Sequence, residues 1–105
     1  MTVLETLRQM LQKFDPAAAK GVNAIVQLNA TGEGGGNYAI TIREGQVALE
    51  EGTVEKPSVT IHVDAKDWVA IALGNLDPTR AFMTGRLKIA GDLGLMMRFQ
   101  RMFMS

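Results

Sequence analysis

The sequence predicts an α+β fold, in which a mixed five-stranded sheet carries helices on one face. Three observations predict it. Apolar residues alternate in five short segments, they repeat with helical spacing in four others, and the stretch between the fourth and fifth alternating segments has room for a crossover connection. We expect residues 1–105 to form one domain, because this length suffices for a hydrophobic core without disulfides or metals.

The first helix is expected over residues 3–14. Thr2 and Glu5 stand three residues apart, which is the spacing of a capping box. Apolar residues then repeat on one side of the helix and polar residues on the other. The Asp15-Pro16 pair is expected to end this helix.

An antiparallel meander is expected next. Residues 22–31, 38–43 and 46–50 show the alternation of half-buried strands. A glycine-rich loop separates the first two strands, and Glu44-Gly45 has the composition of a tight hairpin turn. The first half of the chain is therefore a helix followed by three strands.

The second half begins and ends with a strand, over residues 58–63 and 86–90. Asp64 is positioned to cap a helix between them, and Asp77-Pro78 begins another, since proline fits the first helical position. These two strands enclose about twenty residues of helix, so we expect them to be parallel and joined by a right-handed crossover.

Composition excludes several classes of partner. Eleven basic residues balance eleven acidic ones, so no overall field attracts nucleic acid. No apolar run is long enough to span a membrane, and the first residues lack the layout of a signal peptide. Cysteine is absent, which fits a reducing cytoplasm, and we expect a soluble, cytoplasmic protein. Arg8 and Lys13 on the polar side of the first helix leave transient membrane contact open.

No catalytic, metal-binding or cofactor-binding constellation emerges from the sequence. The glycines of residues 32–36 precede a strand rather than a helix, so a hairpin loop is favoured over a phosphate site. His62 is the single histidine and is expected on the solvent face of its strand, near Arg86 or Lys88. The carboxylates mostly stand at helix starts, where they act as caps. We expect no enzyme activity.

The last helix is the unusual feature. Asp92 is positioned to cap it, and its apolar side chains sweep roughly 220° of the helix circumference, about twice the arc that a surface helix needs. The apolar side chains beyond that arc can be covered by the core, by a second chain or by an apolar ligand. Methionine-rich composition favours an adaptable surface, yet plain core remains the more frequent explanation of such a stripe.

A family pattern appears in residues 57–97, PSVTIHVDAKDWVAIALGNLDPTRAFMTGRLKIAGDLGLMM. The stretch combines a strand begun by a proline, acidic helix starts, and Gly91-Asp92 before the last helix. It closely resembles the sterol carrier protein family, the nonspecific lipid-transfer type with the SCP2 sterol-binding domain. The resemblance is specific over residues 57–105, the first half of the chain agrees more loosely, and the form resembles that of a stand-alone domain.

The resemblance implies a five-stranded sheet covered on one side by helices, with a hydrophobic tunnel between them. Members bind sterols, fatty acids, acyl-CoA and other lipids without covalent chemistry or cofactors. Met97 and Met104 are expected nearer the outside than the tunnel. By this resemblance the tunnel lining consists of inward residues of the last three helices: Trp68, Ile71, Phe82, Met83, Leu95, Met96, Phe99 and Phe103.

Two other functions remain open. The methionine-rich helix could serve a non-catalytic interaction module or homodimer, with Met97, Met102 and Met104 in the contact. An enzyme acting on a lipid-like substrate would need a polar group in the cavity, and Gln100 is the one that the helical arithmetic offers.

Overall fold

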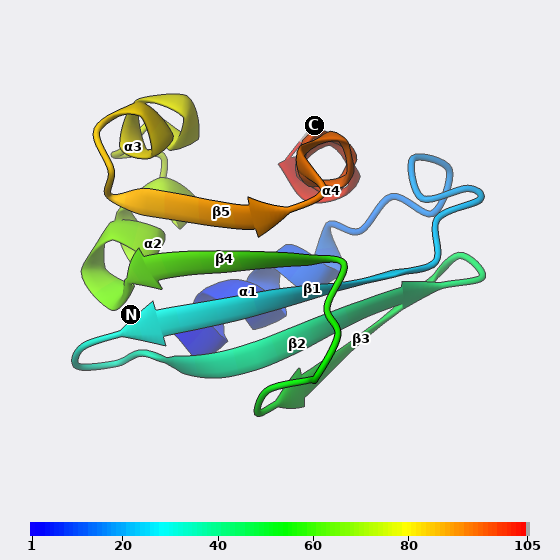
Figure 1. Ribbon diagram of the computed structural model, residues 1–105, viewed down its shortest axis with the longest axis horizontal. Helices are drawn as coiled ribbons and strands as arrows, with labels where there is room; N and C mark the ends of the chain where they lie inside the picture. The colour runs from blue at the N-terminus through cyan, green and yellow to red at the C-terminus, as the bar shows by residue number, and fades with distance from the viewer. Residues whose placement is uncertain (105) are drawn as a thin grey trace.

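The computed structural model describes residues 1–104, the last of them by its backbone alone, as a sheet with four helices (Figure 1). The strand order in the sheet is β3-β2-β1-β4-β5. The predicted fold class is confirmed. The elements are α1 (Val3–Gln12), β1 (Ala24–Thr31), β2 (Gly36–Arg43), β3 (Gln46–Glu51), β4 (Val59–Asp64), α2 (Ala65–Ala72), α3 (Pro78–Met83), β5 (Leu87–Gly91) and α4 (Leu93–Met104).

The helices lie against one face of the sheet, where they bury the apolar side chains of alternate strand positions (Figure 1). On β1, for example, Val26 and Leu28 are buried in this core. They meet Leu7 of α1 and Phe99 of α4 in the same buried cluster. His62 lies exposed on the opposite face, beside Lys88 in the neighbouring strand, as the alternation predicted.

The pairing of β4 with β5 corrects the sequence prediction. These strands are antiparallel, and the parallel pair in the sheet is β1 with β4. Helix α2 has eight residues, about 12 Å, and does not carry the chain back along a six-residue strand of about 20 Å. The chain turns at Gly74, α3 stays at the same end of the sheet, and β5 starts where β4 finished (Figure 1).

The parallel pairing of β1 with β4 depends on the connection over residues 52–58. Its anchor is Gln27, a buried β1 side chain that points away from the helices. The Gln27 amide nitrogen donates to the carbonyl oxygens of Tyr38 and Gly52, at 3.2 and 3.0 Å. The Gln27 side-chain oxygen accepts from the backbone N–H of Val54 at 3.0 Å. One glutamine thus holds the connection against the face that the helices leave open.

The predicted helix caps are present. Backbone N–H groups of the first turns donate to Asp64 at α2, to Asp77 at α3 and to Asp92 at α4. Thr2 and Glu5 form the predicted capping box of α1. The hydrogen bond from the Thr2 backbone N–H lowers the pKa of the Glu5 carboxyl. This stabilisation is present above the unfolded pKa and is lost as the pH falls through the folded pKa.

Gly91 fixes how α4 leaves the sheet. Its φ is +115°, and a Cβ there would lie 2.6 Å from the carbonyl oxygen of Ser58. Only glycine tolerates this approach and this backbone angle, so β5 can end against β4 and α4 can begin two residues later. None of the helices in residues 1–104 is long and apolar enough to cross a membrane.

Candidate ligand cavity between the helices and the sheet

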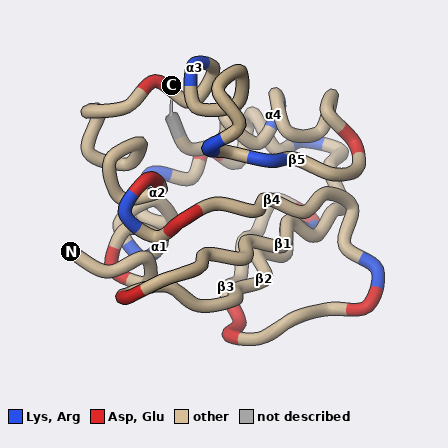
Figure 2. Tube along the Cα trace, turned by 60° about the vertical axis from the view of Figure 1, so that its left-hand side comes forward, with Lys and Arg blue, Asp and Glu red and all other residues tan. Residues whose placement is uncertain are grey.

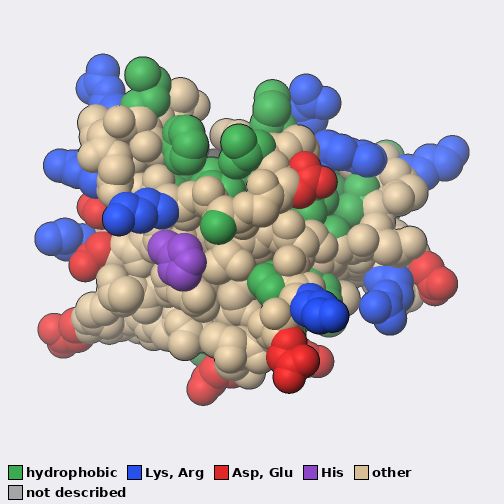
Figure 3. All heavy atoms as spheres, in the orientation of Figure 1, with side chains coloured by type: hydrophobic (Ala, Val, Ile, Leu, Met, Phe, Trp, Pro, Cys, Tyr) green, Lys and Arg blue, Asp and Glu red, His purple; other side chains and the backbone are tan. Residues whose placement is uncertain are grey.

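A cavity of about 410 Å³ lies between α3, α4 and the sheet. In the space-filling view it corresponds to the hollow at the top, between two crests that carry hydrophobic side chains (Figure 3). Every one of the last three helices contributes to its wall, together with β4, β5 and α1. The lining residues are Met10, Ile61, Trp68, Ile71, Pro78, Thr79, Phe82, Leu87, Ile89, Leu93, Met96, Met97, Phe99 and Gln100.

The cavity has a buried floor and an exposed rim. Ile61 of β4 and Phe99 of α4 form part of the floor and are 1% and 2% exposed. Three side chains form the rim. Phe82 of α3 is 45% exposed, and Leu93 and Met97 of α4 are 53% and 62% exposed. The cavity therefore opens to the outside between α3 and α4.

The chemistry of the lining is almost wholly apolar. Among the described residues that line it, Thr79 and Gln100 supply the polar side chains, and both are uncharged. No carboxylate, histidine or amine of residues 1–104 reaches into this space to transfer a proton. Within the same residues, no three side chains of His, Asp or Glu gather where they could hold a metal ion. The arrangement suits an apolar molecule held by burial.

A second cavity of about 270 Å³ adjoins the first. The two share Met10, Trp68 and Ile71, so these three side chains form the partition between them. The second cavity has a more polar wall, with Gln9 and Lys13 of α1. Phe103 of α4 lines this second cavity and not the first.

Trp68 is held in the partition by a buried hydrogen bond. Its indole Nε1–H donates to the hydroxyl oxygen of Thr6 at 3.0 Å, and that hydroxyl donates to the Val3 carbonyl oxygen at 2.6 Å. Both Thr6 and Trp68 are buried. Since a buried N–H without a partner is costly, the threonine fixes the orientation of the indole that separates the cavities.

Replacing Thr6 with valine should lower the free energy of unfolding by about 1–3 kcal/mol, because the buried indole N–H loses its acceptor. Chemical denaturation followed by Trp68 fluorescence measures this loss. Thr6→Ser keeps the hydroxyl and is the matched control, which should recover most of the stability. An equal loss in the serine variant, which keeps the hydroxyl, would contradict the assignment of the valine loss to the hydrogen bond.

The eight residues that the sequence placed in a tunnel fall into three groups. Trp68, Ile71, Phe82, Met96 and Phe99 line the larger cavity, and Phe103 lines the smaller. Two others line neither cavity, namely Met83 and Leu95. Met83 is 78% exposed, because α3 ends at it and successive helical residues point about 100° apart, so Phe82 takes the inward position. Leu95 is half-buried and packs on the core.

The methionines of α4 divide between rim and core. Met97 is exposed at the rim, in line with its expected outer position, whereas Met102 is fully buried. The sequence had offered Met102 for a contact with a second chain, and this is corrected because its side chain is already enclosed in the core. The side chain of Met104 lies outside the described residues.

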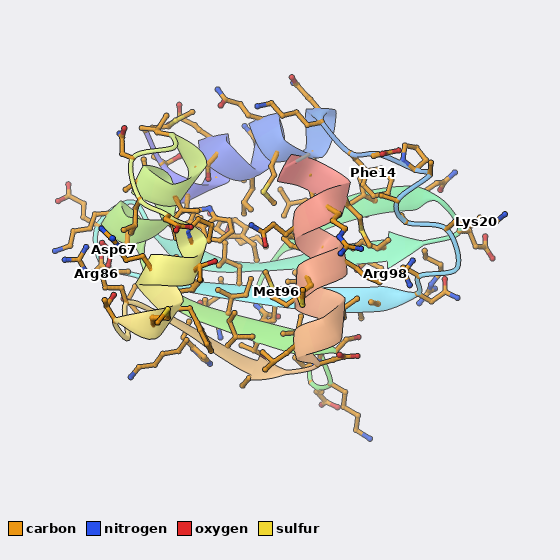
Figure 4. All side chains as sticks on the ribbon, turned by 90° about the horizontal axis from the view of Figure 1, so that it is seen from above. Phe14, Lys20, Asp67, Arg86, Met96 and Arg98 are labelled. Carbon is orange, nitrogen blue, oxygen red and sulfur yellow. The ribbon has the colours of Figure 1, made fainter. Side chains whose placement is uncertain are left out.

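The remaining part of α4 is fixed by contacts on the side away from the cavity (Figure 4). Phe103 packs against Phe14 on this side and against Phe99 of the cavity floor, with tilted rings whose centroids are 5.4 and 4.8 Å apart. The Arg98 guanidinium donates to the Lys20 carbonyl oxygen at 3.0 Å. These contacts leave Met96, on the side of α4 that faces α3, free to line the cavity (Figure 4).

Sequence reasoning missed the contributions of α1 and the sheet. Met10, Ile61, Leu87 and Ile89 line the larger cavity from elements that were read as plain core. Their inward direction followed from the periodicity of each segment. Gln100, which the helical arithmetic offered as a polar group within the cavity, does line it.

Comparison with known proteins gives one family match. The family described as "SCP-2 sterol transfer family" matches residues 4–104. "Hydroxysteroid dehydrogenase-like protein 2" from Xenopus tropicalis is 31% identical over 98 residues, which cover 92% of this chain and 24% of that protein. The chain thus spans about a quarter of the length of the curated relatives it matches.

Solved structures with the same fold include the following two. Palmitated SCP2L2 from Aedes aegypti is 23% identical, with a TM-score of 0.79, and the match covers 100% of this chain and 96% of that one. A double mutant of the sec-alkyl sulfatase PisA1 is 22% identical, with a TM-score of 0.88, and the match covers 100% of this chain and 17% of that one. The same fold therefore occurs both as an almost complete chain and as a small part of a larger enzyme.

Proposed function

Because this chain belongs to the SCP-2 sterol transfer family, we propose that it is a carrier that binds one lipid molecule non-covalently in the cavity between α3, α4 and the sheet. The ligand classes proposed are sterols, fatty acids and acyl-CoA. The proposal involves no covalent step and no cofactor, and it places the protein in the cytoplasm.

The observation that carries the proposal is the open, uncharged cavity with a buried apolar floor. Its volume of about 410 Å³ lies within the range of about 300–1,000 Å³ that small-molecule sites occupy. Phe99 and Ile61 at the floor exclude water, while Thr79 and Gln100 offer neutral hydrogen-bonding groups to a hydroxyl or carbonyl. A charged group at the buried floor would find no counter-ion among these lining residues, so the apolar part of the ligand fills the cavity and the charged end of a fatty acid or acyl-CoA stays at the open rim.

The energetics favour broad specificity. Each methylene moved from water into the cavity contributes about 0.8 kcal/mol, which is about a four-fold change in affinity. Neighbouring chain lengths therefore differ by small factors. An apolar wall selects by volume, so we expect several lipids to bind with comparable affinity.

The direct test is to identify what the protein carries. Protein purified without detergent should show, by native mass spectrometry, a bound apolar molecule that is absent after extraction with organic solvent. The extracted protein should then raise the fluorescence of an environment-sensitive fatty acid, with saturation at one molecule per chain. If no lipid is retained and the fluorescent fatty acid does not bind, the proposal fails.

The partition between the two cavities predicts a chain-length effect. Met10→Ala removes a flexible side chain that lines both spaces and should join them. Hexadecanoate should then gain affinity relative to dodecanoate, by about four-fold for each additional methylene that becomes buried. Displacement of a fluorescent fatty acid by each acid measures the ratio.

Leu11→Ala is the control for that experiment. Leu11 is half-buried on the same helix but lines neither cavity. Its truncation should leave the ratio unchanged while it weakens the packing of α1. An unchanged ratio in Met10→Ala would mean that the two cavities stay separate.

A further inference from the structure

The larger cavity is lined by three thioether side chains. Met96 and Met97 reach it from α4, and Met10 reaches it from α1 at the partition. The chain has no cysteine, so methionine supplies all of its sulfur. Peroxides oxidise a thioether to a sulfoxide, and these three side chains are the ones in the cavity wall that they oxidise most readily. The wall of the cavity is therefore both apolar and reducing.

The three thioethers lie at different depths. Met97 stands at the rim and is 62% exposed, whereas Met96 and Met10 are half-buried. Met96 lies on the side of α4 that faces α3 (Figure 4). Sulfur is thus present between the opening of the cavity and the partition. A reactive group at any of several positions along a bound acyl chain can meet one of these side chains.

The polar groups of the wall suit an uncharged oxygen group on an apolar chain. Thr79 of α3 and Gln100 of α4 line the same cavity. Gln100 follows Met96 by four residues and Met97 by three, so the three side chains share one side of α4. A hydroperoxide group is uncharged, donates and accepts hydrogen bonds, and is carried along the chain of a peroxidised fatty acid. The wall offers hydrogen-bonding groups and sulfur to the same ligand.

We propose that the larger cavity binds fatty-acid hydroperoxides and reduces them to alcohols at Met10, Met96 and Met97. This inference rests on the proposed function, because the cavity must first take up the acyl chain. The sulfur lone pair attacks the terminal oxygen of the hydroperoxide, so a sulfur–oxygen bond forms and the oxygen–oxygen bond breaks. The hydroperoxide proton moves to the oxygen that stays on the chain, which becomes a hydroxyl group. Sulfur loses two electrons, and the peroxide gains them.

Position and charge both favour this step. Binding holds the peroxide beside a sulfur atom, so the reaction no longer depends on an encounter in water. Negative charge develops on the leaving oxygen, and the amide N–H group of Gln100 can donate to it. No acidic residue opposes this charge within α4, whose charged residues are Arg98 and Arg101 (Figure 2). Each methionine reacts once, and methionine sulfoxide reductases can restore it.

The decisive experiment compares two oxidants by peptide mass spectrometry, which locates each added oxygen atom. Met83 is the internal control, because it is 78% exposed and lines neither cavity. With hydrogen peroxide, Met83 should be oxidised at least as fast as Met97. With linoleate hydroperoxide the order should reverse, and Met96 and Met97 should be oxidised at least about tenfold faster than Met83. The same order with both oxidants would overturn the proposal, since exposure alone would then govern the oxidation.

The lipid product gives a second measurement. Each sulfoxide formed at Met10, Met96 or Met97 should be matched by one molecule of hydroxylinoleate, separated by liquid chromatography and quantified by mass. This ratio follows from the transfer of one oxygen atom to one sulfur atom. Sulfoxides without the alcohol, or the alcohol without sulfoxides, would contradict the proposed step.

Leucine substitutions test the role of sulfur. The variant Met10→Leu/Met96→Leu/Met97→Leu keeps apolar side chains of similar volume. Its yield of alcohol per bound hydroperoxide should fall to that of the lipid without protein, and an unchanged yield would overturn the proposal. Met83→Leu is the matched control and should form the alcohol as the unchanged protein does. The comparison of the two oxidants uses the unchanged protein, so it decides the proposal even where the triple variant does not fold.

Binding of an unoxidised fatty acid separates this inference from the proposed function. If a fluorescent fatty acid binds but linoleate hydroperoxide oxidises the methionines in order of their exposure, the carrier function stands and the reduction fails. If the hydroperoxide oxidises Met96 and Met97 selectively while no unoxidised lipid is retained, the reduction stands and the carrier function fails.

Discussion

Replacing Phe99 with alanine is expected to lower the free energy of unfolding by about 3–5 kcal/mol, the usual cost of truncating a buried phenylalanine. Phe99 is 2% exposed, packs against the tilted ring of Phe103 with centroids 4.8 Å apart, and belongs to the core cluster that joins α4 to the sheet. It also lines the larger cavity, so its removal enlarges a space that the neighbouring helices do not close. Guanidinium denaturation followed by circular dichroism measures the change.

Phe82→Ala is the control for this prediction. Phe82 lines the same cavity from α3 but is 45% exposed, so its truncation should cost about 1 kcal/mol or less. The difference between the two phenylalanines would show which wall of the cavity is part of the core. Equal losses would contradict the division into a buried floor and an exposed rim.

Replacing Met96 with tryptophan is expected to weaken fatty-acid binding at least about tenfold, since displacing two methylenes from the cavity already removes roughly 1.6 kcal/mol of favourable burial. Met96 is half-buried and lies on the side of α4 that faces α3, so a larger side chain there extends into the empty volume (Figure 4). Titration with a fluorescent fatty acid measures the loss. The fold should persist, because the space that receives the indole is already present.

Met83→Trp is the same substitution at a methionine that lines neither cavity and is 78% exposed. It should bind fatty acid as the unchanged protein does. If both tryptophan variants bind equally well, the ligand does not occupy the larger cavity. If both variants lose binding, the cause is a general disturbance of α3 and α4. The loss then does not come from an indole that fills the cavity.

Local patterns predicted the elements well because each depends on neighbouring residues. The alternation that predicted strands over residues 22–31 and 86–90 recurs in β1, which begins two residues later, and in β5, which is shifted by one residue. Aspartate caps and the Glu44-Gly45 hairpin turn, with φ of 52° and 74°, also follow from local backbone chemistry. The family resemblance placed Trp68 and Phe99 among the inward residues of the last three helices, and both are buried.

The direction of β5 was predicted wrongly, because the direction of this strand does not depend on neighbouring residues in the chain. Two short helices separated by a turn at Gly74 have the same combined length as one longer crossover helix, and only their packing decides where the chain emerges. The parallel pairing of β1 with β4 likewise depends on Gln27 and its contacts with residues 52–54. No periodicity in the sequence encodes a hydrogen bond across 27 residues.

By itself the sequence determined the fold class, the apolar face of each element and the family pattern, because burial and capping act on residues close in the chain. Only the tertiary structure decided that Met102 is core and Met97 is rim, although both belong to one apolar arc. It also decided that Met10 and Ile61 join the cavity wall. An empty volume exists only where several elements meet, and the distances between elements are set by packing that no single segment contains.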